Sequence, residues 1–195
     1  MDSKHAAMDE IFELYQRYGQ VDYIGEPVSQ IEHMSQSAQL AIEGNYDDEV
    51  ILAAFFHDIG HLCVQATADQ SMAGYGVKSH EKIGADYLRA KGFPERVAKL
   101  VENHVQAKRY LTYKYPAYFE NLSAASKKTL EFQGGVMSEH EAEAFESDSL
   151  FDLSILLRKW DEEAKIRDVP LIGMELLKEK CKAVLSRAET NLFTS

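Results

Sequence analysis

Apolar residues recur with helical spacing along almost the whole chain. In residues 7–19, for example, Ile11, Phe12, Leu14 and Tyr15 fall on one helical face. The same spacing predicts further helices over 28–43, 49–59, 80–91, 95–113, 122–133, 151–165 and 171–189. Alternating, strand-type patterns are nearly absent. The sequence therefore predicts an all-α protein whose single domain spans 1–195.

Glycines and capping residues predict where several of these helices begin and end. Asp47 or Asp48 is expected to cap the helix that begins at residue 49, and Gly60 is expected to end it. Ser79 is expected to cap the helix that follows it. Residues 64–78 are predicted to be irregular, and the acidic stretch 138–150 is assigned to no helix.

Composition and charge narrow the choice of compartment and partner. Apolar residues make up 45% of the chain and charged residues 27%, as in ordinary globular proteins. The sequence has no apolar run of the ~20 residues that span a bilayer, and its N-terminus lacks a signal-peptide pattern. Its two cysteines, Cys63 and Cys181, lie far apart, which favours a reducing compartment. We expect a cytoplasmic protein with no membrane partner.

A net charge of −11 argues against a nucleic-acid partner, because phosphate backbones bind clustered lysine and arginine. The same charge repels small anions. An anionic substrate would therefore need cations concentrated at its own site.

Five of the seven histidines lie beside apolar residues of predicted helices, whereas His5 and His140 lie in polar segments and are expected at the surface. Each of the five alone is more often a hydrogen-bonded histidine than a ligand. Together with Asp58 they form a ligand set for Fe, Mn, Zn or Ni, and a bridging carboxylate can hold two ions. On a continuous helix His57 and His61 would share a face, with Asp58 about 100° away. The five are His33, His57, His61, His80 and His104.

The order of these residues resembles the H…HD…H…H…D pattern of the HD-domain superfamily, with Asp161 as the last member. The resemblance implies a two-metal centre in a helical bundle. One ion would be held by His33, His57 and Asp161, the other by His80 and His104, and Asp58 would bridge them. By itself, Asp161 in RKWDEEAK is more typical of a solvated helix face than of a ligand. Its assignment depends mainly on the superfamily pattern.

Two further groups of residues offer contacts for an anion. Lys108 follows His104 by four residues, so on one helix both side chains point to the same site; the alternative is an exposed surface lysine. Ser126 and Thr129 present hydroxyls on one helix face, with Gln133 beyond them. Surface polarity or helix capping would account for these residues equally well.

Residues near both ends of the pattern could complete a substrate site. Arg158 lies three residues before Asp161, and a guanidinium matches anionic oxygens well. His61 could donate a further hydrogen bond. Tyr23 and Glu26 flank a glycine in a loop, as in a lid over a site, although an ordinary turn would have similar residues.

Taken together, the segments that carry these residues resemble the glycine-forming 2-amino-1-hydroxyethylphosphonate dioxygenases, a family of HD-domain oxygenases with a mixed-valent di-iron centre. The resemblance covers about residues 20–168. It implies two iron ions, Fe(II) and Fe(III), with O2 as cosubstrate. The implied reaction cleaves the C–P bond of a 1-hydroxy-2-aminoethylphosphonate, or of its N-trimethyl analogue, giving glycine or glycine betaine and phosphate. The segments are DYIGE, QIEH, FFHDIGH, SHEKIGADYLR, NHVQAKRYL, SAASKKTLEFQGG and RKWDEEAK.

The same resemblance assigns roles to the other candidates. Tyr23, Glu26 and Lys108 would be the catalytic residues. Tyr23 and Glu26 would also form a gate, and Glu26 would meet the ammonium group of the substrate. The phosphonate would be held by Lys108, Ser126, Thr129, Arg158 and His61.

Two other functions remain open from the sequence. One is an HD-domain phosphohydrolase that uses Mn, Ni or Mg on a nucleotide or another phosphomonoester. The other is a metal-free regulatory or binding module, which would have no need of the complete ligand set. The methylation state of the substrate amine, the oligomeric state (a monomer is the simplest case) and the roles of Gln133 and of helix 171–189 are also open.

Overall fold

The computed structural model describes residues 3–23, 25–64 and 79–192, with side chains described over 6–188 of these ranges. Within them it contains helices and no strand apart from an isolated bridge between Asp22 and Ser29. The all-α prediction is confirmed. The irregular segment predicted over 64–78 lies, from residue 65 on, outside the described residues. The helices are α1 (Ser3–Tyr18), α2 (Gln30–Glu43), α3 (Asp48–Phe56), α4 (Ile59–Val64), α5 (His80–Ala90), α6 (Glu95–Lys114), α7 (Pro116–Asn121), α8 (Ala124–Phe132), α9 (Glu139–Glu146), α10 (Phe151–Glu163) and α11 (Met174–Leu192).

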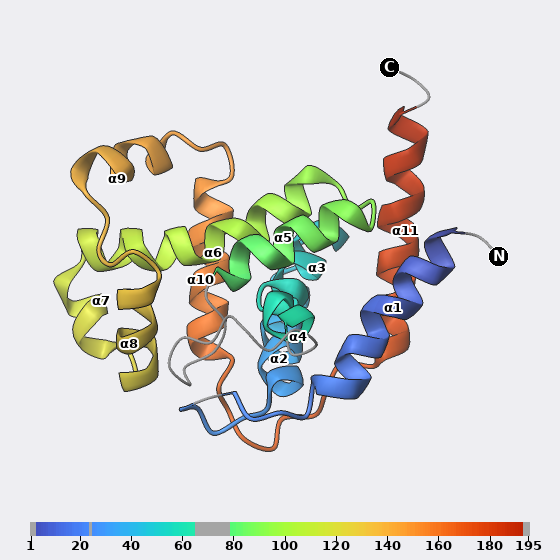
Figure 1. The fold of residues 1–195 in the computed structure, drawn as a ribbon, viewed down its shortest axis with the longest axis horizontal. Helices are drawn as coiled ribbons and strands as arrows, with labels where there is room; N and C mark the ends of the chain where they lie inside the picture. The colour runs from blue at the N-terminus through green and yellow to red at the C-terminus, as the bar shows by residue number, and fades with distance from the viewer. Residues whose placement is uncertain (1–2, 24, 65–78, 193–195) are drawn as a thin grey trace.

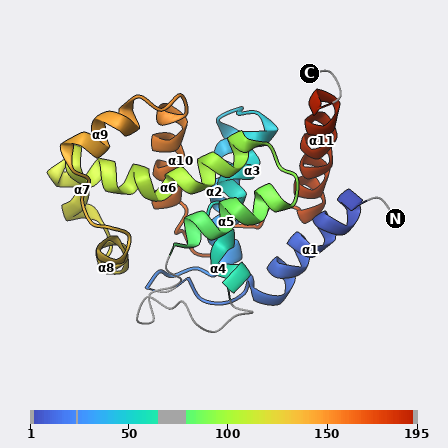
Figure 2. The ribbon, with the colours of Figure 1, turned by 45° about the horizontal axis from the view of Figure 1, so that its top comes forward.

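The helices are arranged around a central group formed by α2, α3 and α4 (Figure 1). The long helix α6 packs against α5, α3 and α10 and extends to one side of the molecule, where α7, α8 and α9 surround its end. On the opposite side α1 and α11 lie together, and both chain ends are found there (Figure 2). The central helices thus meet between two flanking groups.

Helix α3 lies at the centre of the core because apolar side chains cover all of its faces after the acidic first residues. Every residue from Val50 to Phe56 is buried. Phe55 stacks on Tyr15 of α1 with ring centroids 4.5 Å apart, and burying such side chains contributes about 1.5–3 kcal/mol each. As predicted, Asp47 caps the helix by accepting hydrogen bonds from the amides of Glu49 and Val50. The result is a rigid support that ends directly at His57.

The structure corrects the prediction of one continuous helix over 49–59. Helix α3 ends at Phe56, and a new helix, α4, begins at Ile59. His57 and Asp58 form the turn between them, so His57 and His61 do not lie on one unbroken helix face. Asp58 lies in this turn with its side chain buried.

Other differences concern helix ends and two short helices. The acidic stretch contains α9, whose Ser138 and Glu141 form a reciprocal capping box that the sequence analysis overlooked. Helix α7 was also missed, and α11 begins three residues later than predicted. Ser79 precedes α5 but has a positive φ of 59° and makes no side-chain cap. Over the described part of the chain, no helix combines the length and apolar composition needed to cross a bilayer.

Gly60 marks the closest approach of two site-bearing helices. A Cβ atom at this position would lie 1.9 Å from the carbonyl oxygen of His80 and 2.7 Å from its carbonyl carbon. A Gly60→Ala substitution must therefore push α5 away from α4. We expect the free energy of unfolding to fall by roughly 1–3 kcal/mol and metal binding at His80 to weaken. Urea unfolding and metal analysis measure both effects. Gly173→Ala is the control, because a Cβ there meets nothing within 4 Å, and equal effects of the two substitutions would contradict this account.

Candidate metal centre

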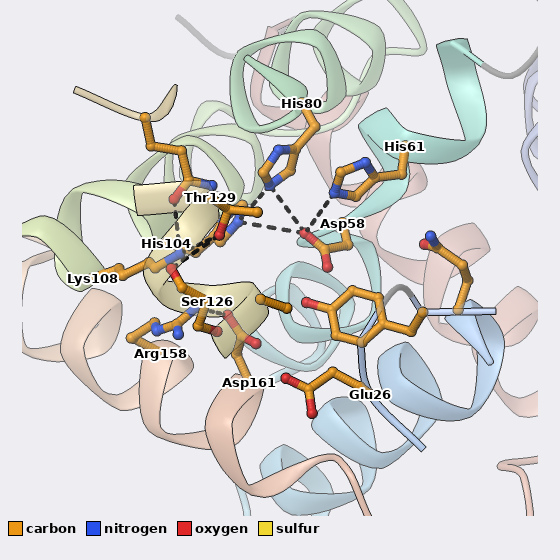
Figure 3. Close-up of a pocket in the computed structure, with 14 residues that line it drawn as sticks. Glu26, Asp58, His61, His80, His104, Lys108, Ser126, Thr129, Arg158 and Asp161 are labelled. Atoms are coloured by element: carbon orange, nitrogen blue, oxygen red, sulfur yellow. Dashed lines mark hydrogen bonds and ion pairs between the residues drawn. The ribbon is translucent and has the colours of Figure 1, made fainter. Parts of the chain in front are cut away.

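Five elements bring the predicted ligands to one place in the bundle. His33 comes from α2, the pair His57 and Asp58 from the turn between α3 and α4, His80 from the first position of α5, His104 from α6, and Asp161 from α10. All six side chains are buried. Figure 3 shows His80 and His104 pointing toward Asp58. Residues from five separate parts of the sequence thus form one cluster.

Asp58 lies between two pairs of histidines. Its Oδ2 atom is 3.7 Å from Nε2 of His33 and 3.5 Å from Nε2 of His57. Its Oδ1 atom is 3.2 Å from Nε2 of His80 and 3.5 Å from Nε2 of His104. Each oxygen therefore faces one pair, which is the arrangement required of a carboxylate that bridges two cations.

The other ring nitrogen fixes the tautomer of three of these histidines. Backbone carbonyl oxygens can only accept hydrogen bonds, so the Nδ1 atoms that contact them carry the proton. His33 donates to Ala164, His57 to Ala54 and His104 to Val101, over 2.9, 2.8 and 2.6 Å. In a neutral imidazole this leaves a lone pair on Nε2. The Nδ1 contacts therefore leave Nε2 as the atom that could bind a metal ion.

Lone pairs and unpaired oxygens converge at both halves of the cluster. The Nε2 atoms of His33 and His57 are 3.0 Å apart, as are those of His80 and His104. Oδ2 of Asp58 and Oδ1 of Asp161 are buried without a hydrogen-bond donor among the described residues. Such groups are costly to bury unless a cation satisfies them. The donor set of imidazole nitrogens and carboxylate oxygens fits a pair of transition-metal ions.

The pKa values of the clustered side chains favour the protonation states that can bind metal ions. Burial lowers the pKa of His57, and it lowers the pKa of His104 to about 3. Burial alone would raise the pKa of Asp58, but His57 and the other imidazoles outweigh it and hold the pKa well below its usual value. For Asp161, burial is likewise outweighed, mainly by Arg158. At neutral pH His57 and His104 are therefore neutral imidazoles, and Asp58 and Asp161 are carboxylates.

These shifts predict how the stability of the metal-free protein depends on pH. A histidine in the unfolded chain gains a proton near pH 6.5, whereas folded His104 gains one only near pH 3. Between these values the unfolded state binds more protons, so stability falls as the pH decreases. We expect a loss of about 2 kcal/mol per such histidine between pH 6.5 and 5. Urea unfolding of protein whose metals have been removed with a chelator measures this loss of stability. His104→Gln should flatten the pH dependence and the exposed control His140→Gln should not; a flat wild-type curve would contradict the prediction.

His61 was predicted to contact the phosphonate, and it also lies against the cluster of predicted metal ligands. Its ring stacks on His80 with centroids 4.1 Å apart, and its Nε2 atom is 3.9 Å from Oδ1 of Asp58. The three side chains form a group that could hold a metal ion. Burial, followed by His80, lowers the pKa of His61 to about 3. It is therefore a neutral imidazole at the edge of the second half of the cluster.

Next to the cluster is a cavity of about 60 Å³ that Lys108 lines together with Ser126, Thr129 and Gln133. Lys108 is buried, so it is not a surface lysine. Its Nζ atom donates to Oγ1 of Thr129 over 2.7 Å and to Oε1 of Gln133 over 2.9 Å. Burial lowers its pKa well below the usual value, and the charge of Arg158 adds to this. No carboxylate of the described residues pairs with it directly, and in its protonated form these two contacts use two of its three N–H donors.

Arg158 also lines the cavity, but its guanidinium is already engaged by protein groups. It forms ion pairs with Asp161 and Glu162, and its Nε atom donates to the hydroxyl of Tyr118 over 2.8 Å. Tyr118 belongs to α7, the helix that the sequence analysis missed. The guanidinium therefore orients Asp161, a predicted metal ligand, and faces the cavity at the same time.

The loop before α2 covers another wall of the cavity. It is closed by the bridge between Asp22 and Ser29, and Ser29 caps α2 in a capping box with Glu32. The Tyr23 ring stacks on His33 with centroids 4.1 Å apart. Burial, followed by the charge of Asp58, raises the pKa of the Tyr23 phenol well above its usual value. The loop thus sets a neutral phenol directly over one half of the cluster.

Several residues at the site were not found from the sequence. Gln30 and Ala125 line the cavity, and Gln133, whose role was left open, also lines it. Ser123 and Lys165 contact Glu26 but do not line the cavity themselves. Ser123 also caps α8, where its side chain accepts a hydrogen bond from the amide of Ser126. Lys165 is the last residue of the segment RKWDEEAK, but no sequence signal distinguishes it from an exposed lysine.

Comparison with known proteins places this site in a family. The HD domain family matches residues 31–143, a range that includes His33, His57, Asp58, His80 and His104. The chain is 40% identical over 165 residues to hydroxymethylphosphonate dioxygenase of Gimesia maris, which covers 85% of this chain and 81% of that protein.

Two further relatives extend over similar lengths. The chain is 38% identical over 156 residues to 1-hydroxy-2-(trimethylamino)ethylphosphonate dioxygenase (glycine-betaine-forming) of Leisingera caerulea, covering 80% of this chain and 79% of that protein. It is 42% identical over 182 residues to an uncharacterized protein of Acanthamoeba polyphaga mimivirus, covering 93% and 83%. The resemblance found in the sequence is confirmed: the chain belongs to the HD-domain family and, within it, to the phosphonate dioxygenases, which are oxidoreductases.

Proposed function

We propose that the chain uses two iron ions and O2 to cleave the C–P bond of a 1-hydroxyphosphonate. His33, His57 and Asp161 would hold one ion, His80 and His104 the other, and Asp58 would bridge them. When bound as an Fe(II)/Fe(III) pair, the metals supply activation of O2. In this proposal the protein acts in the cytoplasm on a small-molecule phosphonate.

The observation that carries this proposal is that the cluster and an anion-binding wall share one cavity. On one side, Asp58 faces two pairs of histidines. On the other, Lys108 is a buried lysine without a carboxylate partner among the described residues, and an anion beside it would favour its charged form. A dianionic phosphonate would fill this deficit of negative charge. The arrangement offers a place for each end of a substrate whose hydroxyl and phosphonate are on the same carbon.

The remaining residues around the cavity would orient the phosphonate. Ser126 and Thr129 are in the first turns of α8, whose N-terminus is favourable for an anion. Arg158 adds positive charge, and His61 can donate a hydrogen bond from its protonated ring nitrogen. In this proposal Tyr23 and Glu26 close the cavity as a gate, which would exclude water from the reacting carbon.

The group attached to the reacting carbon distinguishes the possible substrates. The sequence predicts an aminomethyl group or its N-trimethyl form, giving glycine or glycine betaine with phosphate. The name of one relative specifies a trimethylamino substrate, whereas the name of another specifies hydroxymethylphosphonate, which has no amine. For the simplest case, hydroxymethylphosphonate dianion and O2 give formate, hydrogen phosphate and one proton. The net change breaks the C–P bond and oxidises the carbon at the expense of O2.

Oxygen dependence tests this function. Iron-loaded protein should consume one O2 for each phosphate released from a 1-hydroxyphosphonate, and it should release none under anaerobic conditions. The HD-domain phosphohydrolase is the competing function, and it predicts phosphate release from phosphomonoesters without O2 uptake. Anaerobic phosphate release, or release from phosphomonoesters alone, would refute the proposal.

A further inference from the structure

Glu26, the residue expected to meet the ammonium of the substrate, already has a cation beside it. Its Oε1 atom is 3.1 Å from Nζ of Lys165 and accepts a hydrogen bond from Oγ of Ser123 over 2.7 Å. The side chains of Lys165 and Glu26 are only 14% and 10% exposed. At such exposure water screens the pair weakly. The ammonium of Lys165 therefore already balances most of the negative charge of Glu26 before any substrate arrives.

Lys165 is held in place from both sides along the backbone. The carbonyl of Ala164 accepts the hydrogen bond from Nδ1 of His33. The amide of Ile166 donates to Oε1 of Gln36, and the carbonyl of Ile166 accepts from Nε2 of the same glutamine. Helix α2 thus fixes the residue before Lys165 and the residue after it. Its position is tied to the metal cluster through His33.

A second carboxylate also holds the Lys165 side chain. Its Nζ atom is 3.5 Å from Oε2 of Glu162, so the ammonium lies between Glu162 and Glu26. Moving Lys165 away from Glu26 would break an ion pair in a weakly hydrated environment. Leaving it there would place a substrate ammonium next to a carboxylate whose charge is already compensated. Either course makes a cationic substrate less favourable than a neutral one of the same size.

We propose that Lys165, acting through Glu26, selects 1-hydroxyphosphonates that carry no cationic group, and this inference rests on the proposed function. Lys165 is a positioning residue, since it lies behind Glu26 and does not line the cavity. The proposal replaces the sequence-based expectation that Glu26 receives an ammonium. The preferred substrate class is then hydroxymethylphosphonate and 1-hydroxyphosphonates with neutral substituents.

A matched pair of substrates tests the effect of charge without a change of size. 2-Amino-1-hydroxyethylphosphonate and 1,2-dihydroxyethylphosphonate differ only in an ammonium against a hydroxyl. Wild-type protein should show a kcat/KM at least about 10-fold higher for the dihydroxy compound, equivalent to about 1.4 kcal/mol. Lys165→Gln should remove most of this preference, mainly by lowering the KM of the amine. Glu26→Gln, which leaves Lys165 unpaired on that side, should strengthen the preference.

The control is Lys159→Gln, because Lys159 is an exposed lysine of α10 outside the cavity. Its ratio of kcat/KM values should equal that of the wild type. A wild-type preference for the amine, or an unchanged ratio in Lys165→Gln, would overturn the inference. If neither compound is turned over, the proposed function fails separately. Anaerobic calorimetry of the iron-loaded protein with the same two compounds then decides the inference, since the binding constants should show the same preference.

Discussion

Substituting Asp58 by asparagine should remove both metal ions and nearly all activity. Each carboxylate oxygen of Asp58 faces a different histidine pair. The new amide has no negative charge, and its NH2 group can donate to the Nε2 lone pairs that would otherwise bind metal. Iron content measured by atomic absorption should fall from about two ions to well below one per chain. Turnover should fall by about 10³-fold or more, because metal stabilisation contributes several kcal/mol.

A substitution that removes a ligand of only one proposed metal ion is the matched control for Asp58→Asn. His104→Ala removes a ligand from the pair with His80 but leaves the set around His33 intact. It should therefore lose one ion and keep the other. Asp58→Asn protein that retains both ions would show that the carboxylate is not the bridge. His104→Ala protein that retains both ions would show that the ligand assignment is wrong.

Substituting Lys108 by methionine should leave the metals in place and weaken phosphonate binding. Lys108 is buried, has a lowered pKa and donates only to neutral oxygens. A charge-assisted hydrogen bond to an anion contributes about 1.5–3 kcal/mol. The KM for the phosphonate should therefore rise by roughly 10- to 100-fold, with a smaller change in kcat. Steady-state kinetics and iron analysis of the same preparation measure both effects.

Lys114→Met is the control for this prediction, because Lys114 is an exposed lysine near the end of the same helix. It should leave KM unchanged. Removing the buried charge of Lys108 should also leave the protein as stable as the wild type or more stable, since its charge costs desolvation energy. Iron loss in Lys108→Met protein would mean that Lys108 has a structural role.

The general position of the site could be predicted because each ligand lies in a strongly patterned helix. The apolar run before His57 reads as a buried helix, and the helices carrying His33 and His104 have clear boundaries. Periodicity could not reveal the turn at His57 and Asp58, since Gly60 is the only breaker nearby and it lies two residues later. The direction in which Asp58 points therefore had to come from the structure.

The charged surroundings of the site were less predictable than its ligands. Lys108 and Lys165 look alike in the sequence, yet one is buried against neutral oxygens and the other is paired with carboxylates. These outcomes depend on which side chains arrive from distant segments, such as Glu26 for Lys165. Arg158 was expected to face an anion, but it also holds Asp161 and Glu162. Local sequence carries no information about such long-range pairs.

The position of the metals is the most direct test of the central claim. Anomalous diffraction at the iron absorption edge should show two iron peaks in crystals of the iron-loaded protein. One should lie among His33, His57, Asp161 and Oδ2 of Asp58, and the other beside His80, His104 and Oδ1 of Asp58. A single peak, or two peaks that do not share Asp58, would contradict the account.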